Sequence, residues 1–322
     1  MSENDSDCFV VVPVYNHERF VEKCLRSIFA QTVRPKKLLV IDDGSPDGSA
    51  KVCERVLKDC PFEAEFVTRE NRGLCATLNE GLAASDGKYF AYLGSDDLWL
   101  PRFLEERVRQ LETFPEAILA YGHAYFVDKD DNVFETSADY DEERGSYVDG
   151  DARGMLLDMI VPPSASVCYR RAALDGVAWN EQSRIEDYEM YLQLAAKGTF
   201  TFDPQLLSVW RHHEENTGRN SEMMVSEVIA AQERNFQLLG IGRAELEAVQ
   251  AKARFRYARM MMQHGQKRSA MKLALANMGG AKSIAELAKF GLRFFVPMSL
   301  IETSRKERSR RPTQTVESLL QN

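Results

Sequence analysis

Residues 9–30 read FVVVPVYNHERFVEKCLRSIFA. Residues 9–14 form an apolar, β-branched run whose length is typical of a buried strand. In residues 18–30 the apolar side chains recur at helical spacing, at Phe20, Val21, Cys24, Leu25, Ile28 and Phe29. This stretch therefore predicts a strand that leads directly into a helix.

The same alternation continues through the first third of the chain. Further strands are predicted at 37–41, 64–67 and 88–93, and further helices at 47–57 and 74–84. Strands that alternate with helices are typical of a mostly parallel sheet covered by helices on both faces. We therefore expect the α/β fold class.

Beyond residue 100 the pattern is less regular. The sequence predicts a helix at 101–114, a strand at 118–121, a polar hairpin-like stretch at 128–132, a strand at 161–171 and a helix at 186–197. Strand signals vanish from about residue 223, and helices are predicted near 223–239, 243–263, 266–278 and 282–295. We divide the chain into a catalytic domain at 1–222, a helical C-terminal region at 223–303 and a basic, loosely ordered tail at 304–322.

The composition excludes several classes of protein. Apolar residues make up 44% of the 322 residues, enough for a sizeable core and too many for a disordered chain. The six cysteines include no CxxC pair, which favours a reducing compartment and argues against structural zinc. The N-terminus does not resemble a secretory signal, and no run of 18 uncharged apolar residues occurs. We therefore expect a cytoplasmic protein that does not span a membrane.

Charge is divided unevenly along the chain. Residues 240–322 hold 16 Lys and Arg against 6 Asp and Glu, a net charge of +10, whereas residues 1–239 carry a net charge of −18. The acidic body argues against nucleic-acid binding, because phosphate contacts need clustered basic side chains. Any polyanion would therefore meet the C-terminal part.

Three predicted strands end in polar residues. The ends read PVYN at 13–16, DDGS at 42–45 and GSDD at 94–97, so two of them carry paired carboxylates. Because ligands of such sheets bind beyond the carboxyl ends of the strands, these residues are candidates for a site. Alternatively, each Asp pair serves only in a turn or a helix cap, and its occurrence on two strands argues against this explanation.

Two further chemical features concern carboxylates. Asp96 and Asp97 would offer hard oxygen ligands, which suit Mg²⁺ or Mn²⁺ bound together with phosphate oxygens. Asp187 is predicted at the start of a helix, where the helix dipole favours the ionised carboxylate that a general base needs. Taken alone, Asp187 is better explained as a first-turn or capping acid. ATPase and nicotinamide sites are not indicated, because no Walker sequence and no GxGxxG occurs.

Five stretches, in this order, resemble the family 2 glycosyltransferases of GT-A fold. They lie between residues 9 and 217 and read VVPVYNHERFVEKCLRSIFAQT, LLVIDDGSPDGS, NRGLCATLNEGLAASDGKYFAYLGSDDLWLP, RIEDYEMYLQLAAKG and VWRHHEENT. Each motif is weak by itself, and their order over about two thirds of the chain makes the resemblance specific. It implies a GT-A, Rossmann-like, mostly parallel sheet. The nucleotide-sugar would bind at about 9–121 and the acceptor at about 122–222.

The resemblance also implies roles for individual residues at the first strand ends. Pro13, Tyr15 and Asp43 should contact the nucleotide base. Asn16 and Asn71, which stand in the matched stretches, are assigned to the same nucleotide-sugar site.

A second group of implied roles concerns the diphosphate and the metal. Ser95-Asp96-Asp97 matches a D-x-D element, with Ser95 where many members have Asp. Asp96 would touch the ribose and Asp97 the metal ion, whose affinity without nucleotide we expect to be low because the first carboxylate is absent. Arg211 and His213 match an R-x-H element near the diphosphate, with His213 as a further candidate metal ligand.

Asp187 matches the catalytic base of the family. It would accept the proton of an acceptor hydroxyl that attacks the anomeric carbon, while the metal and Arg211 stabilise the departing diphosphate. We therefore expect an inverting glycosyltransferase that moves a sugar from a UDP-sugar to a glycan or glycolipid in bacterial polysaccharide biosynthesis. Two alternatives stay open: a sugar-phosphate nucleotidyltransferase, and a non-catalytic scaffold that binds sugar nucleotides.

The C-terminal part has two interpretations. In 282–295 the apolar residues form one face of a helix, and residues 305–311 read RKERSRR. An aromatic apolar face beside a basic cluster fits a peripheral anchor at the cytoplasmic face of the inner membrane. Alternatively, the helix packs on the catalytic domain or forms a homodimer, and the basic end is solvated.

Overall fold

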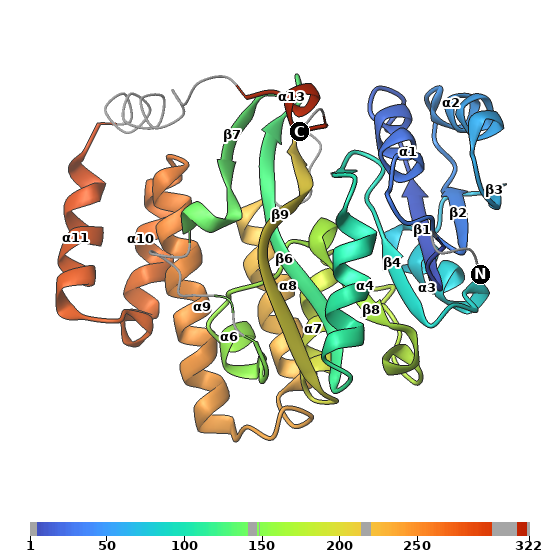
Figure 1. Ribbon diagram of the computed structural model, residues 1–322. Coiled ribbons are helices and arrows are strands. Elements are labelled where there is room, and N and C mark those ends of the chain that lie inside the picture. Colours follow the sequence, from blue (N-terminus) through green and yellow to red (C-terminus); the bar gives the residue numbers. More distant parts are fainter. Residues whose placement is uncertain (1–4, 141–146, 148, 214–219, 298–313, 321–322) are drawn as a thin grey trace.

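The computed structural model describes residues 5–140, 147, 149–213, 220–297 and 314–320 (Figure 1). These residues build one nine-stranded sheet in the order β3-β2-β1-β4-β8-β6-β9-β5, with β7 paired to β6. Its first half is parallel, as predicted, and consists of β1 (Cys8–Val14), β2 (Lys37–Asp42), β3 (Ala64–Thr68) and β4 (Tyr89–Tyr92).

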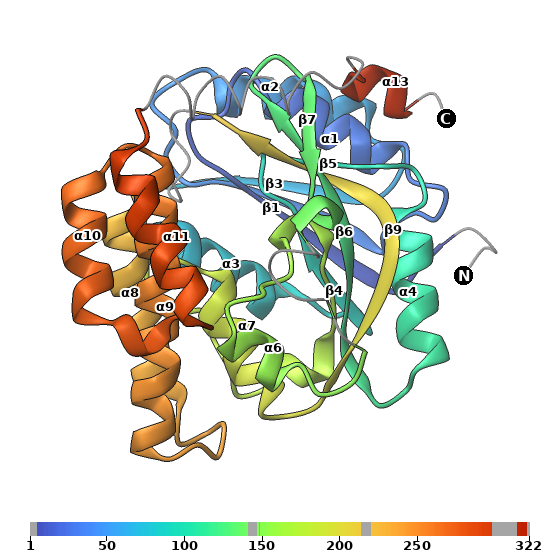
Figure 2. The same ribbon diagram turned by 90° about the vertical axis from the view of Figure 1, so that its left-hand side faces the viewer.

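Helices cover both faces of this parallel half, as the alternating pattern predicts. Neighbouring residues of β1 enter different cores, because side chains of a strand alternate between its faces. Val10 belongs to the core that contains the buried faces of α1 (Val21–Phe29) and α2 (Ser49–Val56), and Val11 to the core that contains α3 (Leu74–Ala84). Figure 2 shows α1 and α2 on one side of the sheet and α3 on the other. The predicted α/β class is confirmed.

The second half of the sheet differs from the prediction. β6 (Ala117–Asp128) is longer than the expected strand at 118–121, and β9 (Thr199–His212), which pairs with it in parallel, was not predicted. Asp203-Pro204 interrupts the apolar pattern of β9, and the β6–β9 register shifts beside it. β8 (Cys168–Arg170) is shorter than the expected strand at 161–171, because prolines at 162 and 163 cannot donate to a ladder. Two short strands complete the sheet, β5 (Leu98–Trp99) and β7 (Val133–Thr136).

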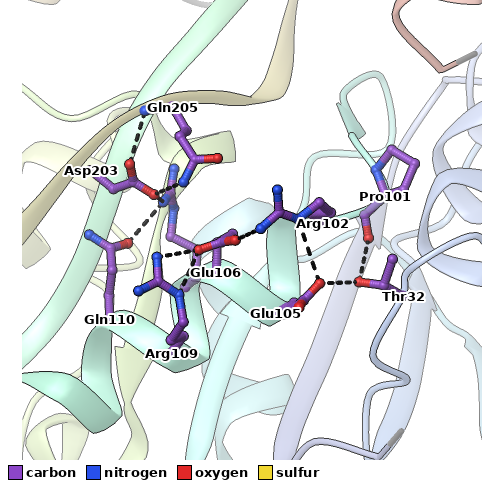
Figure 3. A network of polar contacts seen from close by, with 10 residues as sticks. Thr32, Pro101, Arg102, Glu105, Glu106, Arg109, Gln110, Asp203 and Gln205 are labelled. Carbon is purple, nitrogen blue, oxygen red and sulfur yellow. Dashed lines mark hydrogen bonds and ion pairs between the residues drawn. The ribbon is translucent and has the colours of Figure 1, made fainter. Parts of the chain in front are cut away.

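A buried arginine joins α4 (Phe103–Thr113) to the irregular part of β9. Arg107 donates to the carbonyl oxygen of Ser166 (3.0 Å), to Gln110 (2.8 Å) and to the carboxylate of Asp203 (3.1 Å). Figure 3 shows Asp203 and Gln110 in this network, and beside it a second set of polar contacts in which Arg102 pairs with Glu106 and Glu105, and Glu105 accepts from Thr32. A Cβ atom on Gly122 would lie 2.1 Å from Arg107 Nη2, so the glycine is required here.

The remaining helices gather beside the sheet in Figure 2. They are α6 (Arg153–Leu157), α7 (Asp187–Ala195), α8 (Ser221–Asn235), α9 (Arg243–Gln263), α10 (Lys267–Ala276) and α11 (Ile284–Phe295). Short 3₁₀ turns occur at Leu57–Asp59, Ser137–Tyr140, Ser164–Ser166, Arg171–Leu174 and Met278–Gly280. The helices predicted after residue 222 are thus present, and α8 and α9 share one apolar core with α7 and the sheet.

Helix α11 has apolar side chains on two faces. Phe290 is buried, and Leu287 and Phe294 pack with it against the end of α9 and α10. Ile284 and Phe295, in contrast, are 85% and 81% exposed. Only one face of α11 thus packs against the neighbouring helices. Within the described ranges no helix is long and apolar enough to cross a membrane, and the predicted basic cluster at 305–311 lies outside them.

Part of the expected loosely ordered tail is helical, while its residues 304–313 lie outside the described ranges. Residues 316–320 form α13 (Val316–Leu320), which lies beside β7 and β9 in Figure 1. Val316 and Leu319 are buried against Val127 and Val209 of β6 and β9. Burial of these two side chains, together with the backbone hydrogen bond from Val316 to Asp131, places the segment.

Candidate functional site

The ends of β1 and β2 meet, as parallel neighbours must. Asn16 follows β1 with a φ of 57°, a left-handed conformation that asparagine tolerates better than most residues. Its backbone N–H donates to Ser45 Oγ (3.0 Å), and the N–H of His17 donates to Ser49 Oγ (2.9 Å). Pro13 is buried, while Tyr15, also assigned to the nucleotide base, is 48% exposed beside this junction.

The carboxylate of Asp43, which the sequence assigns to base recognition, binds residues of the loop that follows β3. It accepts hydrogen bonds from the backbone N–H groups of Arg72 and Gly73, both at 2.8 Å, and forms an ion pair with Arg69. A Cβ atom on Gly44, whose φ is +73°, would lie 2.8 Å from the backbone nitrogen of Asn71. The structure therefore brings Asn71 next to the end of β2, and Asp43 holds this loop in place.

The third strand end carries two carboxylates above a glycine. A Cβ atom on Gly94 would lie 2.9 Å from Asp96 Oδ1 and 3.3 Å from Asp97 Oδ2, so both side chains fold back over the end of β4. Asp97 is only 4% exposed and accepts the N–H of Arg211 at Oδ1 (2.8 Å). Burial, and then the neighbouring charge of Asp96, raise the pKa of Asp97 well above its usual value.

Arg211 lies beneath this turn. The side chain is 1% exposed, and its guanidinium donates to the carbonyl oxygens of Asp96 (2.8 Å) and Asp128 (2.9 Å) and pairs with Asp131 (2.7 Å). The ring of Phe20 lies 4.9 Å from its central carbon. These contacts position the turn, and direct contact of Arg211 with the diphosphate stays a prediction.

A histidine that the sequence motifs did not single out completes the accessible side of the turn. His17 Nδ1 lies 2.8 Å from Ser95 Oγ and 3.8 Å from Asp96 Oδ1. His213 Nε2 lies 3.0 Å from Asp96 Oδ2. Although burial opposes the effect, the hydrogen bond from His213 and the nearby His17 lower the pKa of Asp96.

His17, Asp96 and His213 are the one group among the described residues whose donor atoms meet closely enough to hold a metal ion. One ligand atom from each lies within 4.8 Å of the others. Two imidazoles and a carboxylate are a donor set that fits a divalent cation. Of the two predicted ligands, His213 belongs to this group and Asp97 does not.

Asp187, the candidate base, is the first residue of α7 and is partly exposed. Burial raises its pKa to about 6, and its Oδ1 accepts the N–H of Tyr188 (2.6 Å). Burial, together with the charge of Asp187, raises the pKa of the adjacent Glu186 to about 8. The hydroxyl of Tyr92, the last residue of β4, lies 3.5 Å from Glu186 Oε1. The start of α7 is therefore close to the strand end that carries Asp96.

Polar contacts hold α7 in this position. Glu189 forms two contacts of 2.7 Å with Arg234 of α8, which make a bidentate ion pair. The hydroxyl of Tyr188 donates to the carbonyl oxygen of Leu156 (3.2 Å) and accepts from Gln232 (2.9 Å). The helical C-terminal region therefore supports the helix that carries the candidate base.

The sequence also has relatives among known proteins. Residues 9–176 match the family described as Glycosyl transferase family 2. An uncharacterized glycosyltransferase of Nostoc sp. is 26% identical over 172 residues, which cover 52% of this chain and 52% of that protein. The chain thus spans about half the length of this relative, and less of several others that it matches.

Two solved structures share the fold. The mannosyltransferase PcManGT from Pyrobaculum calidifontis, in complex with GDP-Man and Mn²⁺, has a TM-score of 0.60 and 17% identity, covering 98% of this chain and 88% of that one. S. aureus TarS 1–349, in complex with UDP-GlcNAc, has a TM-score of 0.57 and 14% identity, covering 97% and 95%. At these identities the likeness establishes the GT-A fold.

Proposed function

The chain belongs to the family 2 glycosyltransferases, and on this premise we propose that it transfers a sugar from a nucleoside-diphosphate sugar to an acceptor hydroxyl with inversion. The observation that carries the proposal is the partly exposed carboxylate of Asp187 beside the end of β4, with a pKa raised to about 6. A base with this pKa is ionised at neutral pH and still accepts a proton in the transition state.

The proposed mechanism assigns one task to each part of the site. Asp187 removes the proton of the acceptor hydroxyl as its oxygen attacks the anomeric carbon. Asp96 and His213 would hold a divalent ion, Mg²⁺ or Mn²⁺, which neutralises the charge of the departing diphosphate. Arg211 keeps the Ser95–Asp97 turn in place through the carbonyl oxygen of Asp96.

Inversion is supported by the state of the neighbouring carboxyl group. A retaining route through a covalent intermediate would need an ionised carboxylate on the other face of the sugar. Glu186, next to the base, has a pKa of about 8 and is protonated at neutral pH, so it is a poor nucleophile. One displacement with Asp187 as the base requires no second carboxylate.

We place the nucleotide over the junction of β1 and β2. Tyr15 is exposed there, and Asp43 fixes the loop with Asn71 against Gly44, so base contacts would come from this loop and from the Tyr15 ring. A UDP-sugar is our proposed donor, and the fold relatives were solved with UDP-GlcNAc and with GDP-Man. The nucleotidyltransferase alternative is less favoured, because the residues after β1 include neither a lysine nor a glycine-rich loop before α1.

We further propose that α11 contacts an anionic lipid surface at the cytoplasmic face of a membrane, where a glycolipid acceptor of polysaccharide synthesis would be found. Ile284, Leu292 and Phe295 are 85%, 69% and 81% exposed. Residues 264–297 carry six basic residues against Glu286 alone, so charge complementarity favours anionic lipid. All six cysteines are free thiols, which agrees with a cytoplasmic location.

A basic cavity beside α11 would suit a lipid phosphate group. Its volume is about 170 Å³, and it opens between α9 and the start of α11. Its lining includes the cations Lys252, Arg256, Arg259 and Lys282 and the carboxylates Asp158 and Glu286, which form ion pairs with Lys252 and Arg259.

Slow donor hydrolysis tests the proposed activity without knowledge of the acceptor. Purified protein is incubated with UDP-sugars and GDP-sugars plus Mn²⁺, and nucleotide release is followed by chromatography. We expect release from one donor or a few, lost on chelation of the metal. A protein that binds these nucleotides and releases none would instead be a scaffold.

A further inference from the structure

We infer that His17 is a metal ligand that replaces the carboxylate absent at position 95, and that the resulting site prefers Mn²⁺, Co²⁺ or Zn²⁺ to Mg²⁺. The inference rests on the proposed function, because it concerns the ion of the same site. It adds a ligand and a metal selectivity that the sequence motifs do not contain.

The geometry places the three donors around one point. His213 Nε2 and Asp96 Oδ2 are 3.0 Å apart. Neighbouring ligand atoms lie about 3 Å apart when each bond to the ion is ~2.1 Å long. His17 Nδ1 is 3.8 Å from the other oxygen of Asp96, so a small rotation of the imidazole brings it to the same separation.

His17 is held close to the ligating orientation without the ion. Its backbone N–H donates to Ser49 Oγ, and its Nδ1 lies 2.8 Å from Ser95 Oγ, in the turn after β4. The rings of His17 and His213 meet edge to face, with centroids 5.4 Å apart, and Phe20 contacts both, at 6.0 and 5.3 Å. Two imidazoles packed on one aromatic ring lose little further conformational freedom when they bind an ion.

Ser95 explains why a histidine is needed. Family members with aspartate at this position have another carboxylate at the strand end, whereas here Ser95 offers a neutral hydroxyl 2.8 Å from His17 Nδ1. The side of the imidazole that would bind the ion therefore faces the place of the absent carboxylate. A neutral donor here also avoids a third negative charge beside Asp96 and Asp97.

The donor types determine the selectivity. Mg²⁺ prefers carboxylate, phosphate and water oxygens as ligands. Imidazole nitrogens bind Co²⁺ and Zn²⁺ most strongly, Mn²⁺ less strongly, and Mg²⁺ far more weakly than any of these. With two imidazoles and one carboxylate, the free protein should bind these metals without nucleotide. This inference differs from the expectation, drawn from the absent carboxylate, that the metal binds weakly without nucleotide.

Metal binding to the full chain without nucleotide tests the inference. Titration calorimetry and Mn²⁺ electron paramagnetic resonance compare the wild type with His17→Ala and with His264→Ala, whose exposed histidine ends α9. We expect Mn²⁺ affinity to fall at least tenfold in His17→Ala and to stay unchanged in His264→Ala, with Mg²⁺ binding far weaker than Mn²⁺ in the wild type. Equal Mn²⁺ affinity in His17→Ala and wild type, or equal affinity of the wild type for the two metals, would overturn the inference.

A second variant restores the carboxylate. His17→Ala/Ser95→Asp should recover metal binding and lose the preference for Mn²⁺, because an oxygen then replaces the imidazole nitrogen. A double variant as selective for Mn²⁺ as the wild type would contradict the role of His17. Thermal unfolding without metal checks that the variants fold.

These outcomes are separable from the proposed function. If His17→Ala keeps wild-type metal affinity while the wild type releases nucleotide from a donor, only the ligand assignment is wrong. If the metal result is as expected while no donor is hydrolysed, the activity is wrong and the metal site stands.

Discussion

The backbone N–H of Val316 donates a hydrogen bond to the carbonyl oxygen of Asp131 (3.1 Å). The carboxylate of Asp131 pairs with Arg211, which in turn holds the turn with Asp96 and Asp97. Helix α13 is thus connected to the strand-end site through two residues, Asp131 and Arg211. A segment that composition alone marks as a solvated tail therefore supports the site.

Removal of the buried side chain of Leu319 should destabilise the protein. Leu319 is 6% exposed in a small apolar cluster with Val127 and Val209, and truncation of a buried leucine costs about 2 kcal/mol or more. Urea unfolding of Leu319→Ala should show this loss, whereas Glu317→Ala, an exposed position of the same helix, should unfold like the wild type. Equal stability of both variants would mean that α13 does not pack in solution.

Glycine at position 122 should be required by Arg107. A Cβ atom there would lie 2.1 Å from Arg107 Nη2 and 2.5 Å from the carbonyl oxygen of Asp203, so Gly122→Ala should cost about 2 kcal/mol or more. The matched control is Gly154→Ala, where no atom lies within 4 Å of the added carbon and α6 gains a better helix former. Denaturant midpoints compare the two, and a Gly122→Ala protein as stable as Gly154→Ala would exclude the buried network.

Membrane binding should depend on the exposed face of α11. Truncation of the chain after Met278 would not test membrane binding by α11 alone, because it would also delete the hydrogen bond between Val316 and Asp131. Ile284→Ser/Leu292→Ser/Phe295→Ser keeps the packed face intact and should lose cosedimentation with anionic vesicles, while Leu238→Ser, 56% exposed elsewhere, should not. Wild-type binding should weaken with added salt, because basic residues near an anionic leaflet contribute ~1 kcal/mol each. Unchanged vesicle binding of the triple variant, or salt-independent binding, would end the lipid proposal.

The pH dependence of turnover should reflect the ionisation of two carboxyl groups, those of Asp187 and Glu186. Asp187 must be ionised to accept a proton, so turnover should fall as the pH drops through about 6, the value to which burial raises its pKa. Glu186 is protonated up to about pH 8, and its ionisation would add a negative charge beside the base and the diphosphate. We therefore expect a second decline above pH 8 that Glu186→Gln removes. A flat profile between pH 5 and 7 would argue against Asp187 as the base.

The sequence predicts those helices and strands whose apolar periodicity is visible within the segment itself. β1 to α3 carry clear apolar periodicity, and their predicted bounds agree with the structure to within a few residues. β9 depends instead on distant pairing with β6, and Asp203-Pro204 hides it in the sequence. α13 has only five residues, so its position is set by the pocket that receives Val316 and Leu319.

In the site, too, the features with a local sequence signal are predicted and those that depend on distant contacts are not. The ends of β1, β2 and β4 and the start of α7 were correctly expected to carry the polar residues. Neither the burial of Arg211 nor the engagement of Asp43 by Arg72 and Gly73 is visible in a motif, because both depend on loop geometry. His17 was missed for the same reason, and its one sequence signal is a histidine after β1 in a chain whose D-x-D element begins with Ser95.

The most direct test of the central claim is the turnover of Asp187→Asn relative to wild type, measured at neutral pH with a donor that the wild type hydrolyses. The substitution keeps the shape of the side chain and removes proton acceptance, so turnover should fall ~10²-fold or more while donor affinity stays close to wild type. Glu186→Gln is the matched control and should keep most of the activity, because Glu186 is already protonated at this pH. An Asp187→Asn protein that retains more than about a tenth of wild-type turnover would contradict the assignment of Asp187 as the base of the reaction.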